Sequence, residues 1–224
     1  MRGNSCRPGQ HGFTLMELAV VMAIMALLLG GLLLPLSAQS DMRARQESTR
    51  MLTDIRDALL GYALINGKLP CPMPTTVTDP ADTSYGIAAA SCAPGTEGYL
   101  PWKTLGVSET DAWGNPRTLS TQPFNGYWRY RVDAAFASSF TLTTLPASAL
   151  VVMDAAGNTI TETTNNPVVA IVYSAGADLV PGGLNAGTPD TTYQGGPPAS
   201  GFDDILIWIA RPILLNRMVA AGKF

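Results

Sequence analysis

The spacing of apolar and polar residues divides this chain into three stretches. From Phe13 to Ala38 nearly every residue is apolar, and from Gln39 to Ile65 charged residues alternate with apolar ones at helical spacing. Beyond that point, short apolar runs are separated by Gly, Pro and Asn. An α-helix rises about 1.5 Å per residue, so the first stretch is long enough to cross a bilayer. We therefore predict a transmembrane helix over residues 13–38.

The second stretch has the periodicity of an amphipathic helix. Its apolar positions fall at i, i+3, i+7 and i+10 and form one stripe, with charged side chains on the opposite face: Leu52, Ile55, Leu59 and Tyr62. Asn66-Gly67 is a helix stop signal. Residues 39–66 are predicted to continue the membrane helix and to pack the stripe on a globular domain.

The remaining residues, 67–224, are predicted to form a β-rich globular domain. Five short apolar runs predict strands: 127–132, 140–144, 149–153, 168–173 and 205–209. A hairpin turn is expected at 154–158, and a short amphipathic helix after residue 210. An antiparallel sheet of four or five strands against the long helix would bury both apolar faces, which makes the predicted fold class α+β.

The residues around the start of the apolar run indicate an unusual N-terminus. Glu17 places a carboxylate at the head of this run, where an ionisable side chain is costly and points to a function. The preceding residues carry Arg2 and Arg7 but no acid, which favours the cytoplasmic side of a bilayer. Gly12 lies before the apolar region, whereas the small cleavage-site residues of a secretory signal follow it.

The segment from Gly12 to Glu17 resembles the class III leader of type IV pilins and type II secretion pseudopilins. In that family a prepilin peptidase cuts after the glycine and methylates the new N-terminal phenylalanine. The resemblance implies that the leader 1–12 is removed, that Gly12 and Phe13 form the cleavage and methylation site, and that Glu17 acts in assembly. In the family this glutamate neutralises the N-terminal amine of a neighbouring subunit.

The same resemblance implies a pilin-like fold and a structural role in a pseudopilus or pilus. The protein would be a single-pass protein of the bacterial inner membrane, with a cytoplasmic N-terminus and a periplasmic domain, before it joins a filament. Its partners would be the prepilin peptidase, other pilin or pseudopilin subunits, the membrane and an inner-membrane assembly platform. The chain is longer than expected for a major pseudopilin, which favours a minor pilin or pseudopilin.

Two places in the sheet region also resemble major pseudopilins. The segment Asp111–Pro116 with Tyr127–Tyr130 is similar to the Asp-Pro-Trp-Gly-Asn-Pro and Tyr-x-Tyr pattern. Its glycine and proline predict a tight turn, with Trp113 over the core. The segment Tyr173–Asp178 with Phe202–Ile205 is similar to the calcium-binding loop.

Two interpretations of this second place remain open. Calcium takes six to eight oxygen ligands, and Asp178 with Asp203 or Asp204 could supply carboxylates. Alternatively, Asp178 caps a turn, and the other two accept backbone N–H bonds at a strand start. Leu179 stands where the family usually has glycine.

The cysteines and the single histidine limit the chemistry. Cys6 lies in the leader, which leaves Cys71 and Cys92 as a pair in the exported part, so we predict a disulfide. His11 would be lost with the leader, which removes Ser-His-Asp, Cys-His and His-zinc sites. Asp203 and Asp204 are neighbours on a predicted strand and would point to opposite faces. We predict that the protein is not an enzyme.

Charge and loop composition leave one rival function. The net charge is -3 and the basic residues are scattered, so no nucleic-acid partner is predicted. The rival is a membrane-anchored periplasmic ligand-binding or adhesion module that uses loops such as the Thr- and Gly-rich stretch 182–201.

Overall fold

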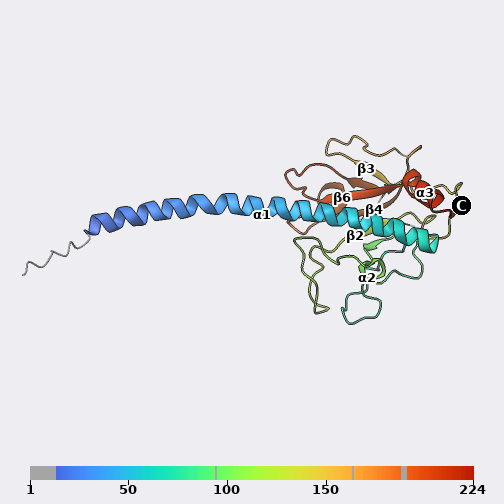
Figure 1. The fold of residues 1–224 in the computed structure, drawn as a ribbon, viewed down its shortest axis with the longest axis horizontal. Helices are drawn as coiled ribbons and strands as arrows, with labels where there is room; N and C mark the ends of the chain where they lie inside the picture. Colours follow the sequence, from blue (N-terminus) through green and yellow to red (C-terminus); the bar gives the residue numbers. More distant parts are fainter. Residues whose placement is uncertain (1–13, 94, 163, 188–190) are drawn as a thin grey trace, which may run out of the picture. The chain divides into compact units, whose positions relative to one another are not determined.

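The computed structural model describes residues 14–93, 95–162, 164–187 and 191–224, and within them the side chains of 29–38 are not described. The chain forms two compact units, 1–42 and 43–224, and helix α1 (Leu15–Asn66) runs through both (Figure 1). We describe each unit by itself.

Local hydrogen bonds mark both ends of helix α1. The Thr14 hydroxyl accepts the backbone N–H of Glu17 at 3.2 Å, as a helix N-cap does. At the other end Gly67 takes a left-handed φ of 68° and donates its N–H to the Ala63 carbonyl at 2.8 Å. The predicted stop at Asn66-Gly67 is confirmed.

The first part of α1 exposes its apolar side chains. Leu15 is 88% exposed and Leu27 is 77% exposed, and every residue from 14 to 28 is exposed. A search of the described residues finds no helix with the length and apolar character needed to cross a membrane.

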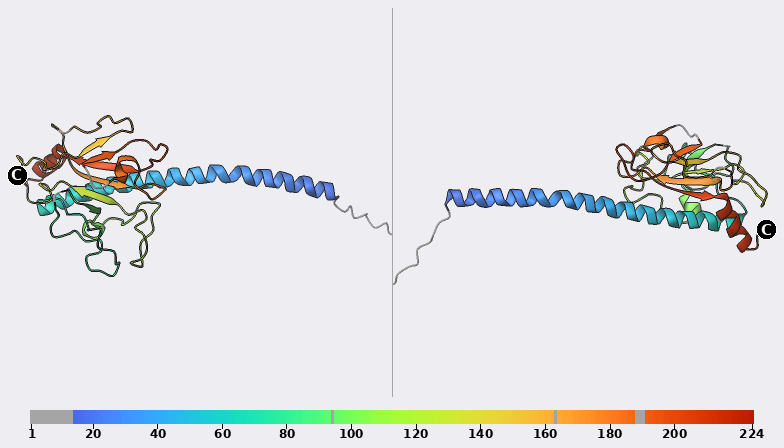
Figure 2. Two further views of the ribbon diagram at one scale, coloured as in Figure 1. Left: turned by 180° about the vertical axis from the view of Figure 1, so that it is seen from behind. Right: turned by 90° about the horizontal axis from the view of Figure 1, so that it is seen from above.

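The globular unit is built on a four-stranded antiparallel sheet. Its strands, in spatial order, are β1 (Glu97–Tyr99), β2 (Arg129–Val132), β4 (Val168–Ser174) and β6 (Ile205–Ala210). One face packs on the second half of α1 and on α3 (Arg211–Ala220), which share one core with it (Figure 2). The predicted helix on an antiparallel sheet is therefore confirmed.

A second, smaller sheet covers the opposite face. Strands β3 (Val151–Met153) and β5 (Thr192–Gln194) pair in parallel, and Val152 and Tyr193 pack on Ile171. The predicted turn at 154–158 is present, with an Asp154 N–H to Asn158 carbonyl bond of 2.8 Å. It leads into a single antiparallel bridge, Met153 with Thr159, rather than a second full strand.

One predicted strand is wrong and two short strands were missed. Residues 140–144 form a turn, in which the Thr144 hydroxyl accepts the Thr141 N–H at 2.9 Å and the Thr141 carbonyl accepts the Thr144 N–H at 3.1 Å. Threonine hydroxyls compete with ladder pairing in this way. Strands β1 and β5 have only three residues each, which is too short for a clear alternation. The short helices α2 (Trp102–Leu105) and η1 (Gly183–Ala186) were also not predicted.

The predicted disulfide joins Cys71 to Cys92, whose Cα atoms lie 5.5 Å apart. The bond holds the proline-rich connector that follows α1, residues 68–80. The same connector pairs with the sheet edge, where Met73 and Tyr99 exchange backbone bonds of 2.8 and 3.0 Å. The connector is therefore fixed covalently and by hydrogen bonds.

Candidate functional site

The N-terminal candidate residues fall at the boundary of the described chain. Gly12 and Phe13, the predicted cleavage and methylation residues, lie outside the described residues. Glu17 is in the first turn of α1 and is exposed, between the exposed Met16 and Leu18. The structure therefore presents one carboxylate on an apolar helical surface. Exposed apolar surfaces larger than a few hundred Å² mark sites of contact with protein or membrane.

The two pseudopilin-like places in the sheet region lie side by side. Asp111 Oδ1 accepts the N–H groups of Trp113 and Gly114 at 2.9 and 2.8 Å, which forms the predicted turn. Asp111 Oδ2 accepts the Ser174 hydroxyl at 2.5 Å. Burial raises the pKa of Asp111, while these hydrogen bonds act in the opposite direction. One buried carboxylate thus joins segments that the sequence separates widely.

These two segments also hold α1. The Ser48 hydroxyl, fully buried, accepts the Ala112 N–H at 3.1 Å. One helical turn earlier, Arg45 Nη1 donates to the Asp203 carbonyl at 2.9 Å. The two motif loops, 111–116 and 202–205, therefore form hydrogen bonds with the second half of the helix.

The three candidate calcium ligands each accept N–H donors. Asp203 Oδ2 accepts the Ala177 and Asp178 N–H groups at 2.6 and 3.3 Å. Both Asp204 oxygens lie 3.1 Å from the Gly182 nitrogen, and its Oδ2 also accepts Asn185 Nδ2 at 2.8 Å. Asp178 Oδ1 accepts the Val180 N–H at 2.9 Å and so caps its own turn.

In these contacts the loop directs amide hydrogens at the carboxylates, and each carboxylate keeps further lone pairs. Calcium would need six to eight oxygen ligands directed at one point. Among the described residues, no three or more His, Cys, Asp or Glu side chains are grouped so that they could hold a metal ion. The turn-cap alternative describes the contacts that these three carboxylates make. A calcium site at Asp178, Asp203 and Asp204 stays a prediction.

Burial makes Asp204 the most perturbed of these carboxylates. Its side chain is among the least exposed in the loop, at 1%, and desolvation raises its pKa to about 6. The negative charges of Asp203 and Asp178 raise it further, and the hydrogen bonds from Asn185 and Gly182 oppose the shift. Leu179 stands at the position where the pseudopilin resemblance implies glycine, and it has a left-handed φ of 62°.

Sequence reasoning missed the buried carboxylate of Glu97. Glu97 Oε1 accepts Arg129 Nη2 at 2.6 Å and the Tyr173 hydroxyl at 3.0 Å, and Oε2 accepts the Tyr193 hydroxyl at 2.6 Å. This group ties β1, β2 and β4 to β5 across the two sheets. It depends on strand register, which a single sequence does not reveal, although the alternation of Arg129 and Arg131 on a strand was a signal.

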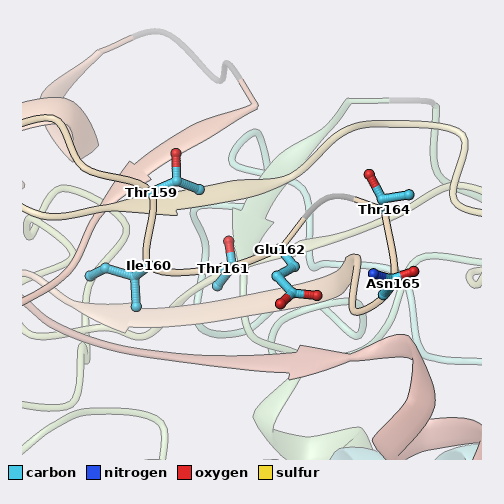
Figure 3. A pocket seen from close by; sticks show the side chains of 6 residues that line it. All are labelled: Thr159, Ile160, Thr161, Glu162, Thr164 and Asn165. Atoms are coloured by element: carbon cyan, nitrogen blue, oxygen red, sulfur yellow. The ribbon is translucent and has the colours of Figure 1, made fainter.

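One surface depression lies next to β3, and its described lining residues hold no catalytic set. One open depression of about 340 Å³ lies beyond β3 and is lined by Thr159, Ile160, Thr161, Glu162, Thr164 and Asn165 (Figure 3). Hydroxyls, one amide and one carboxylate line it, and the Glu162 carboxylate accepts a long 3.4 Å bond from Asn166. Neither a nucleophile with its base nor a pair of carboxylates is brought together there.

Comparison with known proteins identifies the N-terminus. Residues 7–33 match the family model described as the prokaryotic N-terminal methylation motif. The chain carries the type IV pilin and pseudopilin signature. This pilin-type signature includes Gly12, Phe13 and Glu17 and ends inside α1. No curated protein and no solved structure matches the chain.

Proposed function

We propose that the protein is a non-enzymatic structural subunit, a pseudopilin or minor pilin, of a type II secretion pseudopilus or a type IV pilus. The observation that carries this proposal is the methylation motif over residues 7–33, which leads directly into an exposed apolar helix. A pilin-type chain needs that helix for packing and not for chemistry.

In the proposed mechanism, a prepilin peptidase removes residues 1–12 and methylates Phe13. Residues 13–38 hold the subunit in the inner membrane, with the N-terminus cytoplasmic and the domain 67–224 periplasmic. A platform in that membrane then brings subunits together. Inside lipid or a helix bundle, the Glu17 carboxylate and a neighbour's N-terminal amine each supply the partner that the other lacks, which sets the register.

The contrast between the two halves of α1 supports an assembly role for the first half. The apolar stripe of residues 43–66 is buried in its own domain, so this stripe cannot also serve as the subunit contact. The exposed apolar residues before Met42 remain available, and packing against neighbouring helices would replace packing against lipid. Long connections between the strands account for the chain's length and support a minor subunit over a major one.

The test compares Glu17→Ala with Glu47→Ala, an exposed glutamate on the same helix. Each variant is expressed in the native cell, and the protein is followed by immunoblot in the sheared filament fraction and in the membrane fraction. We expect Glu17→Ala to be absent from filaments and present in membranes with its Cys71–Cys92 bond intact, while Glu47→Ala assembles normally.

Two results would count against this proposal. Normal incorporation of Glu17→Ala would show that Glu17 has no role in assembly. A wild-type protein that stays in the membrane fraction whenever filaments are made would favour the anchored ligand-binding or adhesion module.

A further inference from the structure

The two cysteines of the disulfide differ in their exposure to solvent. Cys71 is buried, at 5% exposed, whereas Cys92 is half-buried and packs against the main core from outside. Cys92 also lines an open surface depression of about 380 Å³, and Cys71 is not among the described residues that line it. A small molecule in solution therefore approaches the disulfide from the Cys92 side.

The chain on both sides of Cys71 is held by hydrogen bonds to the globular domain. The Leu69 N–H donates to a carbonyl of the turn after β2 at 2.8 Å, and the Pro70 carbonyl accepts the Tyr130 hydroxyl at 3.0 Å. Two residues beyond Cys71, Met73 pairs with the edge of β1 through backbone hydrogen bonds. The position of Cys71 therefore does not depend on the disulfide alone.

The chain around Cys92 has fewer anchors. Before it, the Ala88 N–H donates to the Thr104 hydroxyl at 2.9 Å, and after it the Ala93 carbonyl accepts the N–H of Thr96 at 3.2 Å, which is a local contact. Residues 89–92 form no hydrogen bond with any other described residue. A segment with few hydrogen bonds opens at low cost in free energy. When the disulfide is broken, Cys92 is therefore the half that moves, while Cys71 stays in place.

The depression beside Cys92 has a positive charge. Lys68 is half-buried and lines it, and the other described lining residues are alanines, serines and one asparagine besides Cys92. The reactive form of a thiol is the thiolate, which is an anion. A surface that combines a lysine with neutral residues attracts a thiolate, and attracts it more strongly when its carrier also has carboxylates.

We propose that Cys92 is the site at which a small acidic thiol attacks the disulfide, and that Cys71 is the resolving cysteine. The incoming thiolate forms a bond with Cys92 Sγ, the Cys71–Cys92 bond breaks, and its electron pair stays on Cys71 as a thiolate. The product is a mixed disulfide on Cys92. In the reverse step, the anchored Cys71 thiolate attacks Cys92 Sγ and releases the small thiol. The site is independent of the filament role proposed for the N-terminal helix.

The test uses the full chain in detergent micelles with the substitution Cys6→Ser, which removes the third cysteine. Glutathione, a thiol that carries carboxylates, is added at increasing concentration, and the exchange is stopped with acid. Free thiols are then blocked with a maleimide, and peptide mass spectrometry locates the glutathione. We expect it on Cys92 at least about tenfold more often than on Cys71, because exchange depends on access to the sulfur.

Two comparisons connect this preference to the fold. In the same chain unfolded in urea, both cysteines should carry glutathione about equally, because burial no longer distinguishes them. The variants Cys71→Ser and Cys92→Ser, each with Cys6→Ser, are treated with oxidised glutathione, which transfers one glutathione to the remaining thiolate. Cys92 should react about tenfold faster than Cys71 while tryptophan fluorescence shows that both variants are folded.

The preference for an acidic thiol is tested with cysteamine, a cationic thiol, at equal thiolate concentration and low salt. Glutathione should react several-fold faster than cysteamine, and Lys68→Gln should remove this difference, because the charge of Lys68 attracts the carboxylates. Lys223→Gln, at an exposed position, is the matched control and should keep the difference.

Three results would overturn the proposal. The folded protein could carry glutathione on Cys71 as often as on Cys92, which would remove the assigned roles. The disulfide could resist glutathione until the domain unfolds, which would show that Cys92 is not open to attack. Equal rates for glutathione and cysteamine would exclude the acidic thiol as the preferred reagent.

Discussion

Both halves of helix α1 carry large apolar side chains, but only those of the second half are buried. In the second half, Leu52, Ile55 and Leu59 are at most 1% exposed and lie in the main core. In the first half, Leu15 and Leu27 are almost fully exposed. Removal of apolar surface from water contributes about 25 cal/mol per Å². The exposed side chains of the first half gain none of this stabilising free energy from their own chain.

This difference separates folding from assembly. The second half is held by its apolar stripe and by polar contacts from Arg45 and Ser48 to the motif loops. The first half exposes its described apolar side chains on both sides of the carboxylate Glu17. We infer that the second half stabilises the domain and that the first half is buried by lipid or by other subunits.

The largest expected effect contrasts one leucine from each half. Leu59→Ala should lower the free energy of unfolding of the globular unit by about 3 to 4 kcal/mol, because it opens a cavity in a fully buried site. Leu27→Ala should change it by less than about 0.5 kcal/mol. Urea unfolding followed by tryptophan fluorescence measures both. Equal losses would break the comparison.

Removal of the disulfide should come next. The Cys71→Ser/Cys92→Ser double variant should lose about 3 kcal/mol, because the bond closes a loop with a sequence separation of 21 residues in the globular unit. We expect the urea midpoint to fall and assembly of the surviving folded protein to be unaffected. A variant of unchanged stability would show that hydrogen bonds alone hold the connector after α1.

The pH dependence of the free energy of unfolding tests the burial of Asp204 in its loop. Asp204 has a pKa of about 6 in the folded protein against 3.8 as the reference, so the folded state binds more protons between these values. Its contribution to stability is full below about pH 4 and is lost as pH rises through about 6, by up to about 3 kcal/mol.

Asp204→Asn should remove this component from thermal or urea unfolding measured between pH 4 and 7. The exposed Asp54→Asn is the matched control and should keep it. If the Asp204→Asn profile is the same as that of the wild type, the buried carboxylate does not titrate in this range.

The smallest effect concerns the link between the two motif segments. Ser174→Ala removes the hydroxyl that donates to Asp111 and accepts the Gly176 N–H at 3.0 Å, so it should cost about 1 to 2 kcal/mol. Ser139→Ala, at an exposed position, should be close to neutral. A neutral Ser174→Ala would show that Asp111 is held by its own turn alone.

The sequence predicted features that depend on local pattern. The stripe through Leu59, the stop at Gly67, the cysteine pair and the strands β2, β3, β4 and β6 all follow from periodicity, turn chemistry or redox compartment. The strand at 140–144 failed because its threonine hydroxyls bond to the neighbouring backbone. Local pattern cannot weigh that competition.

Features that depend on long-range contact were beyond the sequence. The meeting of Asp111 with Ser174, and that of Glu97 with Tyr193, require the register and stacking of strands far apart in the chain. The candidate site was therefore predicted in its N-terminal motif residues but not in the contacts that fix the helix to the loops.

The most direct test of the account is the intact mass of the protein recovered from membranes of cells with and without a prepilin peptidase. The account predicts loss of residues 1–12 together with the gain of one methyl group, and only where the peptidase is present. A full-length, unmethylated chain in both cells would contradict it and would leave the N-terminal helix as a simple anchor.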